Sequence, residues 1–212
     1  MSELLRRAGI ALLDIVYPPR CLLCGEYAEP FCAVCRAEIV PVETNLPSPA
    51  GLAGVACVGY HEEALRSAVL NLKFRREAAL VRPLGELLAA ELERRRSEWR
   101  PDGLAPVPMH WTRRWERGFD HTELLARSTG RAANVPVLNA LRRARRVPPQ
   151  VGLEAEERKR NLRGVFAMED RASVRGLRLV VLDDVRTTGS TLSECAATLR
   201  AAGAAAVYGL TI

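Results

Sequence analysis

The stretch that decides the fold reads Val180-Val181-Leu182-Asp183-Asp184-Val185-Arg186-Thr187-Thr188-Gly189-Ser190-Thr191-Leu192. An apolar run, Leu177 to Leu182, leads into it, and a helical pattern from Leu192 to Ala202 follows it. We therefore predict a buried strand, a turn and a helix, with two acids at the carboxyl end of the strand. Ligands of open α/β sheets bind at this end of the strands.

Residues 187 to 191 have the composition of a phosphate-binding loop. Gly189 allows close approach of the backbone, successive N–H groups form an anion-binding nest, and the following helix adds the positive end of its dipole. Hydroxyl donors are supplied by Thr187, Thr188, Ser190 and Thr191. The same residues also suit a plain strand-turn-helix corner, because hydroxyl side chains favour helix N-caps whether or not a ligand binds.

The two acids require a different partner, because carboxylates repel a phosphate. Asp183 and Asp184 could accept hydrogen bonds from ribose hydroxyls or hold a Mg²⁺ ion. A ribose 5-phosphate satisfies the acids and the loop together. The sequence therefore predicts a sugar-phosphate site at the end of this strand.

Strand-like and helical patterns alternate along the chain from residue 55 onward. Apolar residues have helical spacing in Leu65–Leu72, Leu84–Leu92, Leu124–Ser128 and Glu154–Leu162. Short apolar strands are predicted at Leu104–Pro108 and Ala204–Ile212. This rhythm is typical of an α/β fold in which helices flank a mostly parallel sheet with right-handed crossovers.

The length of 212 residues suits one main domain with a small appendage. Pro18-Pro19 ends an amphipathic pattern that covers residues 4 to 15, and a stretch bearing Pro, Gly and Ser covers residues 41 to 54. We predict an N-terminal helix and cysteine module at residues 1–40, a linker at 41–54 and the main domain at 55–212.

The net charge and the hydropathy limit the classes of partner that the chain can have. A formal net charge of +6 favours a polyanionic partner or a phosphate-rich ligand, although a solvated basic surface gives the same charge. No apolar run approaches the about 20 residues of a membrane span, so we expect no membrane insertion. Arg6-Arg7 imitates the start of an export signal, but Asp14 interrupts the apolar run and no cleavage site follows. A cytoplasmic protein is predicted.

Four cysteines near the N-terminus are paired as C-x₂-C, seven residues and C-x₂-C: Cys21, Cys24, Cys32 and Cys35. Paired C-x₂-C turns deliver the four thiolates of a tetrahedral zinc site, and four protein ligands make that zinc structural. Disulfides and a redox-active C-x-x-C are the alternatives, and a reducing cytosol disfavours the former. Cys57 and Cys195 lie in apolar surroundings and are predicted to pack in the core.

Several stretches, in their order along the chain, resemble the ComF family. They are Tyr17–Cys21, Leu72–Phe74, Pro106–His110, Arg117–Phe119, Gln150–Leu153 and Arg158–Phe166. ComF proteins link a type I phosphoribosyltransferase-like fold to a short N-terminal zinc-binding module, and they are associated with DNA uptake in naturally competent bacteria. The stretch 180–192 itself resembles the 5-phosphoribosyl-1-pyrophosphate (PRPP) motif of type I phosphoribosyltransferases.

This resemblance implies roles for individual residues. Asp183 and Asp184 would contact the ribose as catalytic residues, residues 187–191 would hold the 5-phosphate, and Mg²⁺ would accompany PRPP. The pyrophosphate side would comprise Pro108, Met109, His110, Arg113 and Arg117. A mobile loop at Arg142–Leu153, bearing Arg146 and Gln150, would close over the site and exclude water. The arginines of the pyrophosphate side, Arg113 and Arg117, could instead form a solvated helix face.

One departure from the family pattern lies beside the expected site. The family usually follows Arg-Gly-Phe with Asn-Gln, whereas this chain has Asp120-His121. An acid and an imidazole thus replace two neutral amides, so hydrogen-bond donors could be lost and pH dependence gained.

Two functions from different classes follow. The first is an enzyme, or a former enzyme, that binds PRPP with Mg²⁺. The second is a non-catalytic protein that handles single-stranded DNA with other competence-machinery proteins and holds the phosphate backbone through its basic residues, namely Arg94–Arg96, Arg142, Arg143, Arg145 and Arg146. Aromatic residues make up only 5% of the chain, which counts against base stacking by the second function.

Overall fold

The computed structural model describes residues 18–42, 47–109, 118–144, 164–169 and 174–212. The helices predicted at residues 4–15 and 154–162 lie outside this part of the chain. So do five of the predicted site residues, His110, Arg113, Arg117, Arg146 and Gln150.

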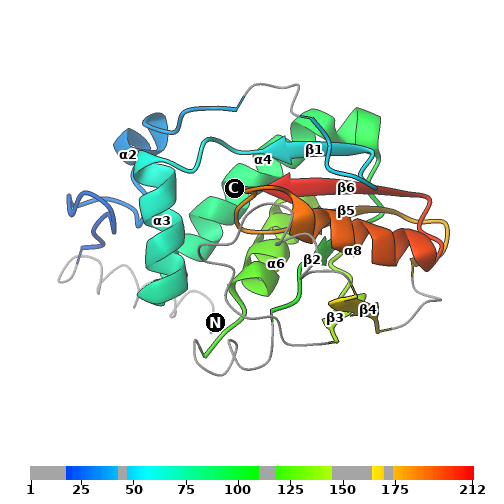
Figure 1. Ribbon diagram of the computed structural model, residues 1–212. Coiled ribbons are helices and arrows are strands. Elements are labelled where there is room, and N and C mark those ends of the chain that lie inside the picture. Colours follow the sequence, from blue (N-terminus) through cyan, green and yellow to red (C-terminus); the bar gives the residue numbers. More distant parts are fainter. Residues whose placement is uncertain (1–17, 43–46, 110–117, 145–163, 170–173) are drawn as a thin grey trace, which may run out of the picture.

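A central sheet of four parallel strands organises the described residues (Figure 1). Its strands are β1 (Gly54–Cys57), β2 (Gly103–Pro106), β5 (Arg178–Leu182) and β6 (Ala206–Thr211), in the order β1-β6-β5-β2. Val180 of β5 lies opposite Tyr208 on one side and Leu104 on the other. The predicted α/β fold with a parallel sheet is therefore confirmed.

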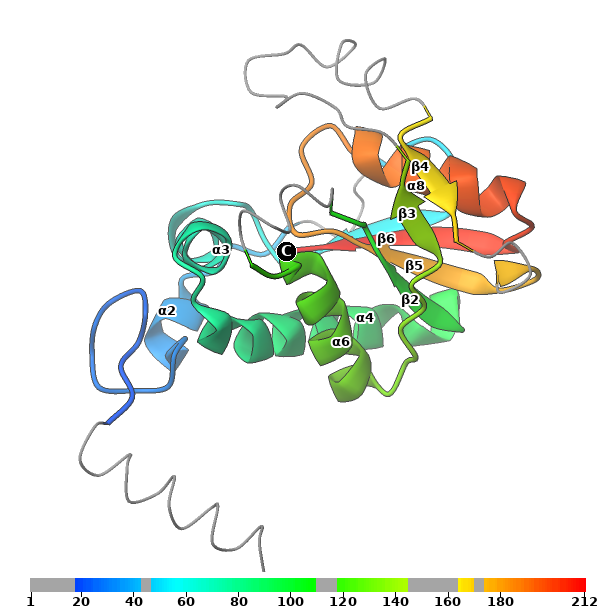
Figure 2. The ribbon, with the colours of Figure 1, turned by 90° about the horizontal axis from the view of Figure 1, so that it is seen from below.

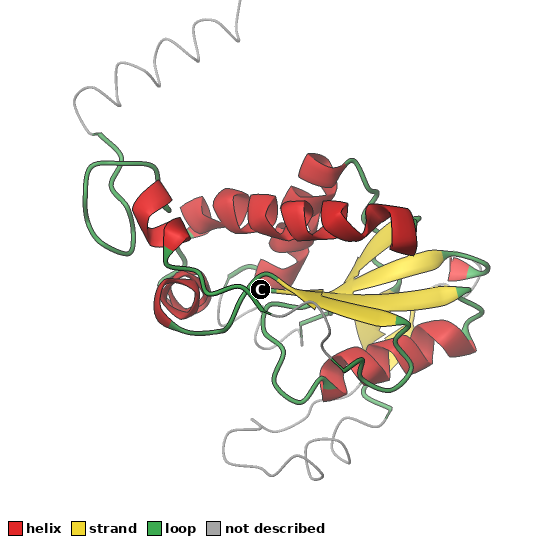
Figure 3. Ribbon diagram, turned by 90° about the horizontal axis from the view of Figure 1, so that it is seen from above, coloured by secondary structure: helices red, strands yellow, loops and turns green. Residues whose placement is uncertain are grey.

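Helices cover both faces of the sheet (Figures 2 and 3). On one face lie α4 (Val81–Trp99) and α6 (His121–Ala133); on the other lie α8 (Ser190–Ala201) and a hairpin of β3 (Leu141–Arg143) and β4 (Phe166–Met168). The helix α3 (Glu63–Phe74), which the 3-10 turn η1 (Ala78–Leu80) joins to α4, lies beyond the carboxyl ends of β1 and β6 (Figure 1). The short helix α2 (Ala33–Ala37) packs against α3.

Alternation along the strands produces two hydrophobic cores, because successive side chains point to opposite faces of a sheet. The core under α4 and α6 receives Leu104, Val180, Leu182, Tyr208 and Leu210. The core under α8 and the hairpin receives Ala105, Val107, Leu179, Val181 and Val207. Burial on both faces explains why β5 reads as a continuous apolar run.

Arg178 is the exception in that run, and the fold uses it at the start of β5. Its guanidinium donates hydrogen bonds to the carbonyl of Trp99 at 2.6 Å and to the hydroxyl of Tyr208 at 2.7 Å. The rings of Trp99 and Tyr208 stack with their centroids 4.8 Å apart. The end of α4 is thereby tied to the amino end of the sheet.

The helices predicted from residues 65, 84, 124 and 192 onward are present, as are the strands predicted at 104, 177 and 204. The hairpin of β3 and β4 was not predicted, because its strands are three residues each and leave too short a pattern to detect. Within the segment predicted as a linker, Leu52 is buried in the core under α8. The division into domains stays a prediction.

Candidate functional site

The site lies where β5 and β2 end side by side. Because the two strands are parallel, Pro106 lies opposite Leu182, and the N–H of Val107 donates to the carbonyl of Leu182 at 2.9 Å. The acid pair that follows β5 therefore lies next to Pro108 and Met109, which follow β2. Two motifs separated by more than seventy residues in the sequence meet at one edge of the sheet.

Asp184 is held by two basic side chains from different helices. Lys73 of α3 places its Nζ 2.8 Å from Oδ2 of Asp184, and Nε2 of His121, the first residue of α6, hydrogen-bonds the same oxygen. The side chains of Lys73 and Asp184 are only 17% and 13% exposed. Both partners contact Oδ2, so Oδ1 of Asp184 has neither of these two side chains on it.

The two acids have opposite electrostatic environments. Burial alone would raise the pKa of Asp184, but the hydrogen bond from His121 and the charge of Lys73 outweigh it and lower this pKa well below its usual range. Burial, together with the adjacent charge of Asp184, raises the pKa of Asp183 to about 7. The surroundings therefore favour the charged form of Asp184 and the protonated form of Asp183.

The loop that follows the acids is shaped for close contact with an anion. Gly189 has φ +74°, and a Cβ atom at this position would lie 2.5 Å from Cγ of Pro49. Helix α8 begins at the next residue, so its first N–H groups have no partner within the helix and face the loop. The hydroxyls of Thr188 and Ser190 lie 2.7 Å apart. Residues 183 and 185–192 line a small hollow here.

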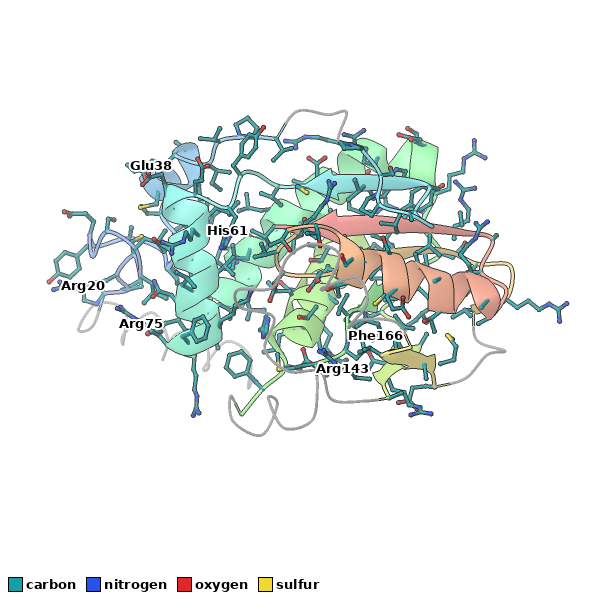
Figure 4. The ribbon with its side chains drawn as sticks, viewed as in Figure 1. Arg20, Glu38, His61, Arg75, Arg143 and Phe166 are labelled. Atoms are coloured by element: carbon teal, nitrogen blue, oxygen red, sulfur yellow. The ribbon has the colours of Figure 1, made fainter. Side chains whose placement is uncertain are left out.

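A larger cavity of about 450 Å³ opens on the other side of the acids, between the end of β2, the start of α6 and the hairpin. Pro108, Met109 and Arg143 are among its lining residues. The charge of Arg143 lowers the pKa of Asp183, against the larger effect of burial, and its guanidinium carbon lies 5.7 Å from the ring centre of Phe166 (Figure 4). The hairpin thus brings a cation to the side where pyrophosphate was predicted.

Pro108 and Met109 are the pyrophosphate-side residues that the structure describes, and both line this cavity. The sequence assigned no role at this site to Lys73, and it placed Arg143 both in the predicted mobile loop and among the DNA contacts. Lys73 stands in the stretch Leu72–Phe74 that resembles the family, and that stretch was the available signal. Its role could not be deduced, because the contact with Asp184 spans two elements that only the fold brings together.

The four paired cysteines converge on one point. Their sulfur atoms all lie within 4.8 Å of one another, and Cys21–Cys35 and Cys24–Cys32 are each separated by 3.8 Å. Sulfur ligands about 2.3 Å from a tetrahedral zinc ion are about 3.8 Å apart, whereas a disulfide requires about 2.05 Å. The thiols therefore have the arrangement of ligands for a structural zinc ion.

Local backbone structure prepares this zinc site. Cys32 caps helix α2, and its sulfur accepts a hydrogen bond from the N–H of Cys35 at 3.5 Å. Burial would raise the pKa of Cys21, but backbone N–H groups, those of Cys24 and Cys32 first, lower it to about 6. Phe31, between the two cysteine pairs, is fully buried in the core under α4. The zinc module is thus packed against the α/β part of the molecule.

Comparisons with known proteins agree with both parts. Residues 12–48 match the double zinc ribbon domain. DNA utilization protein YhgH of Escherichia coli K12 is 35% identical over 172 residues, which cover 79% of this chain and 75% of that protein. The chain belongs to the ComF family. Competence protein F of Haemophilus influenzae is 28% identical over 82% of this chain and 80% of its own length, and Competence protein ComFC of Bacillus subtilis is 25% identical over 88% and 73%.

Two solved structures are also similar to this ComF-family chain, which covers a quarter of each. One is described as the allosteric regulatory enzyme of purine biosynthesis, with 25% identity over 62% of this chain and a TM-score of 0.42. The other is glutamine PRPP amidotransferase from B. subtilis, with 24% identity over 61% and a TM-score of 0.41.

Within the described residues, no helix combines the length and hydropathy needed to cross a bilayer.

The departure from the ComF pattern at residues 120 and 121 has a structural role. Oδ1 of Asp120 accepts from the N–H of Glu123 at 3.1 Å, which caps α6, and Oδ2 accepts from the N–H of Met109 at 3.3 Å. An asparagine has one acceptor oxygen and could not fill both places with separate atoms. Nε2 of His121 hydrogen-bonds Oδ2 of Asp184, so the second residue of the departure contacts the acid pair directly.

Proposed function

We propose that this chain binds PRPP, or a related phosphoribosyl ligand, with Mg²⁺ at the carboxyl edge of the sheet. The observation that carries the proposal is the position of Asp184, held by Lys73 and His121, directly before the loop at Gly189 and the start of α8. A ribose offers hydroxyl donors to carboxylates, and its 5-phosphate fits the N–H groups at the start of α8. The cavity beside Pro108 and Met109 leaves room for the pyrophosphate.

The residues present fit a hard cation as well as a sugar. Carboxylate oxygens are the ligands that Mg²⁺ prefers, and it usually takes one or two of them together with substrate phosphates. Asp183 and Oδ1 of Asp184 would supply such oxygens. The chemistry that Mg²⁺ adds when bound is neutralisation of the pyrophosphate charge.

The relatives support a biological setting for this ligand. Their names refer to competence and to DNA utilization, so we propose that the protein acts in the uptake or use of DNA.

A purely DNA-binding function is less well supported. Arg94 pairs with Glu91, and Nε of Arg96 lies 2.6 Å from a carboxylate oxygen of Glu93, so carboxylates on their own helix already neutralise these two arginines.

Calorimetry of the full chain with PRPP and Mg²⁺ tests the proposal. We expect saturable binding that Asp184→Asn weakens by about tenfold or more, because this change removes the charge that Lys73 and His121 hold in place. Glu98→Gln, at an exposed site, removes the same charge elsewhere and should bind like the wild type. Equal affinity in Asp184→Asn and the wild type would contradict the proposal. A separate assay for pyrophosphate release would show whether the bound ligand reacts.

A further inference from the structure

The last turn of helix α3 connects the zinc module to the acid pair. Asn71 and Lys73 both lie in this turn, and their side chains contact different parts of the molecule. Nδ2 of Asn71 donates to the carbonyl of Leu22 at 3.1 Å. Nζ of Lys73 lies 2.8 Å from Oδ2 of Asp184. One turn of helix therefore joins two sites that are far apart in the sequence.

Helical geometry accounts for the two directions. Residues two positions apart are separated by about 200° around the axis of an α-helix, so Asn71 and Lys73 point to roughly opposite sides. Leu72, between them, is buried in the core under α4. A movement of this turn that breaks the contact on one side therefore also disturbs the contact on the other.

The carbonyl that Asn71 contacts belongs to the zinc module. Leu22 stands in the first C-x₂-C turn, between Cys21 and Cys24, and its N–H donates to the carbonyl of Pro30 at 3.0 Å. A zinc ion held by these two cysteines would fix the turn on either side of Leu22. Modules of this size have too little core to keep such a turn in place without their metal. The position of this hydrogen-bond acceptor thus depends on zinc.

Lys73 needs a well-placed backbone to reach the acid. Its ammonium stands on a flexible four-carbon stem, so the ion pair with Asp184 is kept only if the end of α3 stays in position. Helix α3 lies beyond the carboxyl ends of the strands, and α2 of the zinc module packs against it (Figure 1). The zinc module is therefore a support of the helix that carries Lys73.

We propose that Asn71 is a positioning residue that acts through Lys73: the zinc-loaded module holds the end of α3 by way of Asn71, and this keeps the ammonium of Lys73 on Asp184. Zinc and the phosphoribosyl ligand then favour each other's binding. This linkage rests on the proposed phosphoribosyl function, whereas the positioning of Lys73 does not. Coupling between two binding sites is reciprocal, so each ligand raises the affinity for the other by the same factor.

The Nζ signal of Lys73 tests the positioning role without any ligand. The sequence has only two lysines, so NMR of the full, zinc-loaded chain with ¹⁵N-labelled lysine gives two side-chain signals, which Lys159→Arg assigns. Asn71→Leu keeps the approximate size of the side chain and removes the donor. We expect it to move the Lys73 signal at least halfway to its position in Asp184→Asn, while the zinc content stays near one equivalent. An unmoved signal would overturn the proposal.

Two variants of the same helix separate this role from a general loss of stability. Val69→Ala removes methyl groups from the core and keeps the amide of Asn71, so it should lower the stability without moving the Lys73 signal. Ser67→Ala, at an exposed position one turn before Asn71, should change neither. If Val69→Ala moves the signal as far as Asn71→Leu does, Asn71 is a structural residue only.

Calorimetry with PRPP and Mg²⁺ tests whether the effect reaches the ligand. We expect Asn71→Leu to weaken PRPP binding by about fivefold or more, and Lys73→Met by at least as much. Because Asn71 acts through Lys73, adding Asn71→Leu to Lys73→Met should weaken binding further by less than about twofold. Fully additive effects of the two substitutions would contradict the proposal.

Zinc affinity, measured by competition with a zinc-selective dye, tests the reciprocal effect. PRPP with Mg²⁺ should tighten zinc binding by about fivefold or more in the wild type, and by less than about twofold in Asn71→Leu. Equal tightening in both proteins would mean that the linkage does not pass through Asn71.

The outcomes separate this inference from the function on which its linkage rests. If PRPP binds no variant but Asn71→Leu moves the Lys73 signal, the phosphoribosyl proposal fails and the positioning role stands. If PRPP binds the wild type and zinc-loaded Asn71→Leu equally well, the inference fails and the phosphoribosyl proposal stands. Should Asn71→Leu not fold, Asn71→Ala, which places no bulky apolar group against the carbonyl of Leu22, is measured in the same way.

Discussion

Lys73 and Asp184 form the contact that joins helix α3 to the acid pair, with Nζ of Lys73 2.8 Å from Oδ2 of Asp184. His121 binds the same oxygen from α6. Two helices that precede β5 in the chain therefore converge on the residue that follows it. This contact fixes the charge of the site and also ties α3 to the edge of the sheet, so its removal should affect binding and stability together.

Replacing Lys73 by methionine should break the ion pair with Asp184 and leave the hydrogen bond from His121 in place. Breaking a buried ion pair from one side typically lowers stability by about 3 kcal/mol, and we expect a loss of about 2 to 3 kcal/mol in the free energy of unfolding because His121 remains. Urea unfolding measures it. Arg66→Met, at an exposed position of the same helix, should cost less than about 0.5 kcal/mol. Similar losses in both variants would show that the pair contributes nothing specific.

The raised pKa of Asp183 predicts a stability that falls as the pH rises. Because its folded-state pKa is about 7 and its unfolded value is about 4, the folded state holds an extra proton between these values. That stabilisation is complete below about pH 4 and is lost as the pH rises toward 7. Asp184, with a lowered pKa, has the opposite dependence, and its stabilisation is lost only as the pH falls below about 4.

Urea unfolding between pH 5.5 and 7.5 checks this dependence. Asp183→Asn should flatten the fall, which is at most about 1.4 kcal/mol per pH unit for one proton. If the free energy of unfolding falls equally with pH in the wild type and in Asp183→Asn, Asp183 does not titrate in this range. Glu98→Gln serves as the control for loss of one acid.

Removing the metal should destabilise the core under α4 as well as the cysteine module. Protein purified without chelator should hold about one equivalent of zinc, and Cys35→Ser should hold far less. Because Phe31 is buried in the core under α4, the variant should also melt at a lower temperature and not merely lose the module. Cys57→Ala, which changes a cysteine outside the cluster, should keep its zinc. Less than about half an equivalent in the wild type, with every thiol titratable, would argue against a zinc site.

Gly189→Ala tests the close approach at the phosphate loop. The backbone strain of a left-handed residue is about 1 to 2 kcal/mol, and the added Cβ would also meet Pro49. Gly176→Ala is a matched control, because Gly176 has φ +76° but no atom within 4 Å of the added Cβ. Both variants should lose stability, but only Gly189→Ala should lose PRPP binding. Intact binding in Gly189→Ala would remove the loop from the proposed site.

Local patterns accounted for most of the regular structure. The helices α3, α4 and α8 and the strands β5 and β6 are long enough for apolar spacing to reveal them. The hairpin of β3 and β4 could not be predicted in this way, because three residues hold no period. Yet that hairpin carries Arg143 to the acid pair, so the missed element contributes to the site.

The acid pair shows the same limit at the level of single residues. Adjacent aspartates predicted a ribose contact, but nothing in the sequence distinguished one from the other. The structure makes them different, because Lys73 and His121 reach Asp184, whereas Asp183 is half-buried beside that charge. The roles of Asp120 and His121 likewise depend on Met109 and Asp184, with which they form hydrogen bonds only in the folded chain.

The sequence by itself determined the features whose chemistry is contiguous: the acid pair and loop at 183–191, and the two C-x₂-C turns, each of which places its donors within a few residues of one another. The tertiary structure decided which acid is charged, which cations neutralise it and where a cavity opens beside the loop. These depend on the packing of α3, α6 and the hairpin against the sheet. Electrostatic interactions act through space between segments distant in the chain, so no local pattern records them.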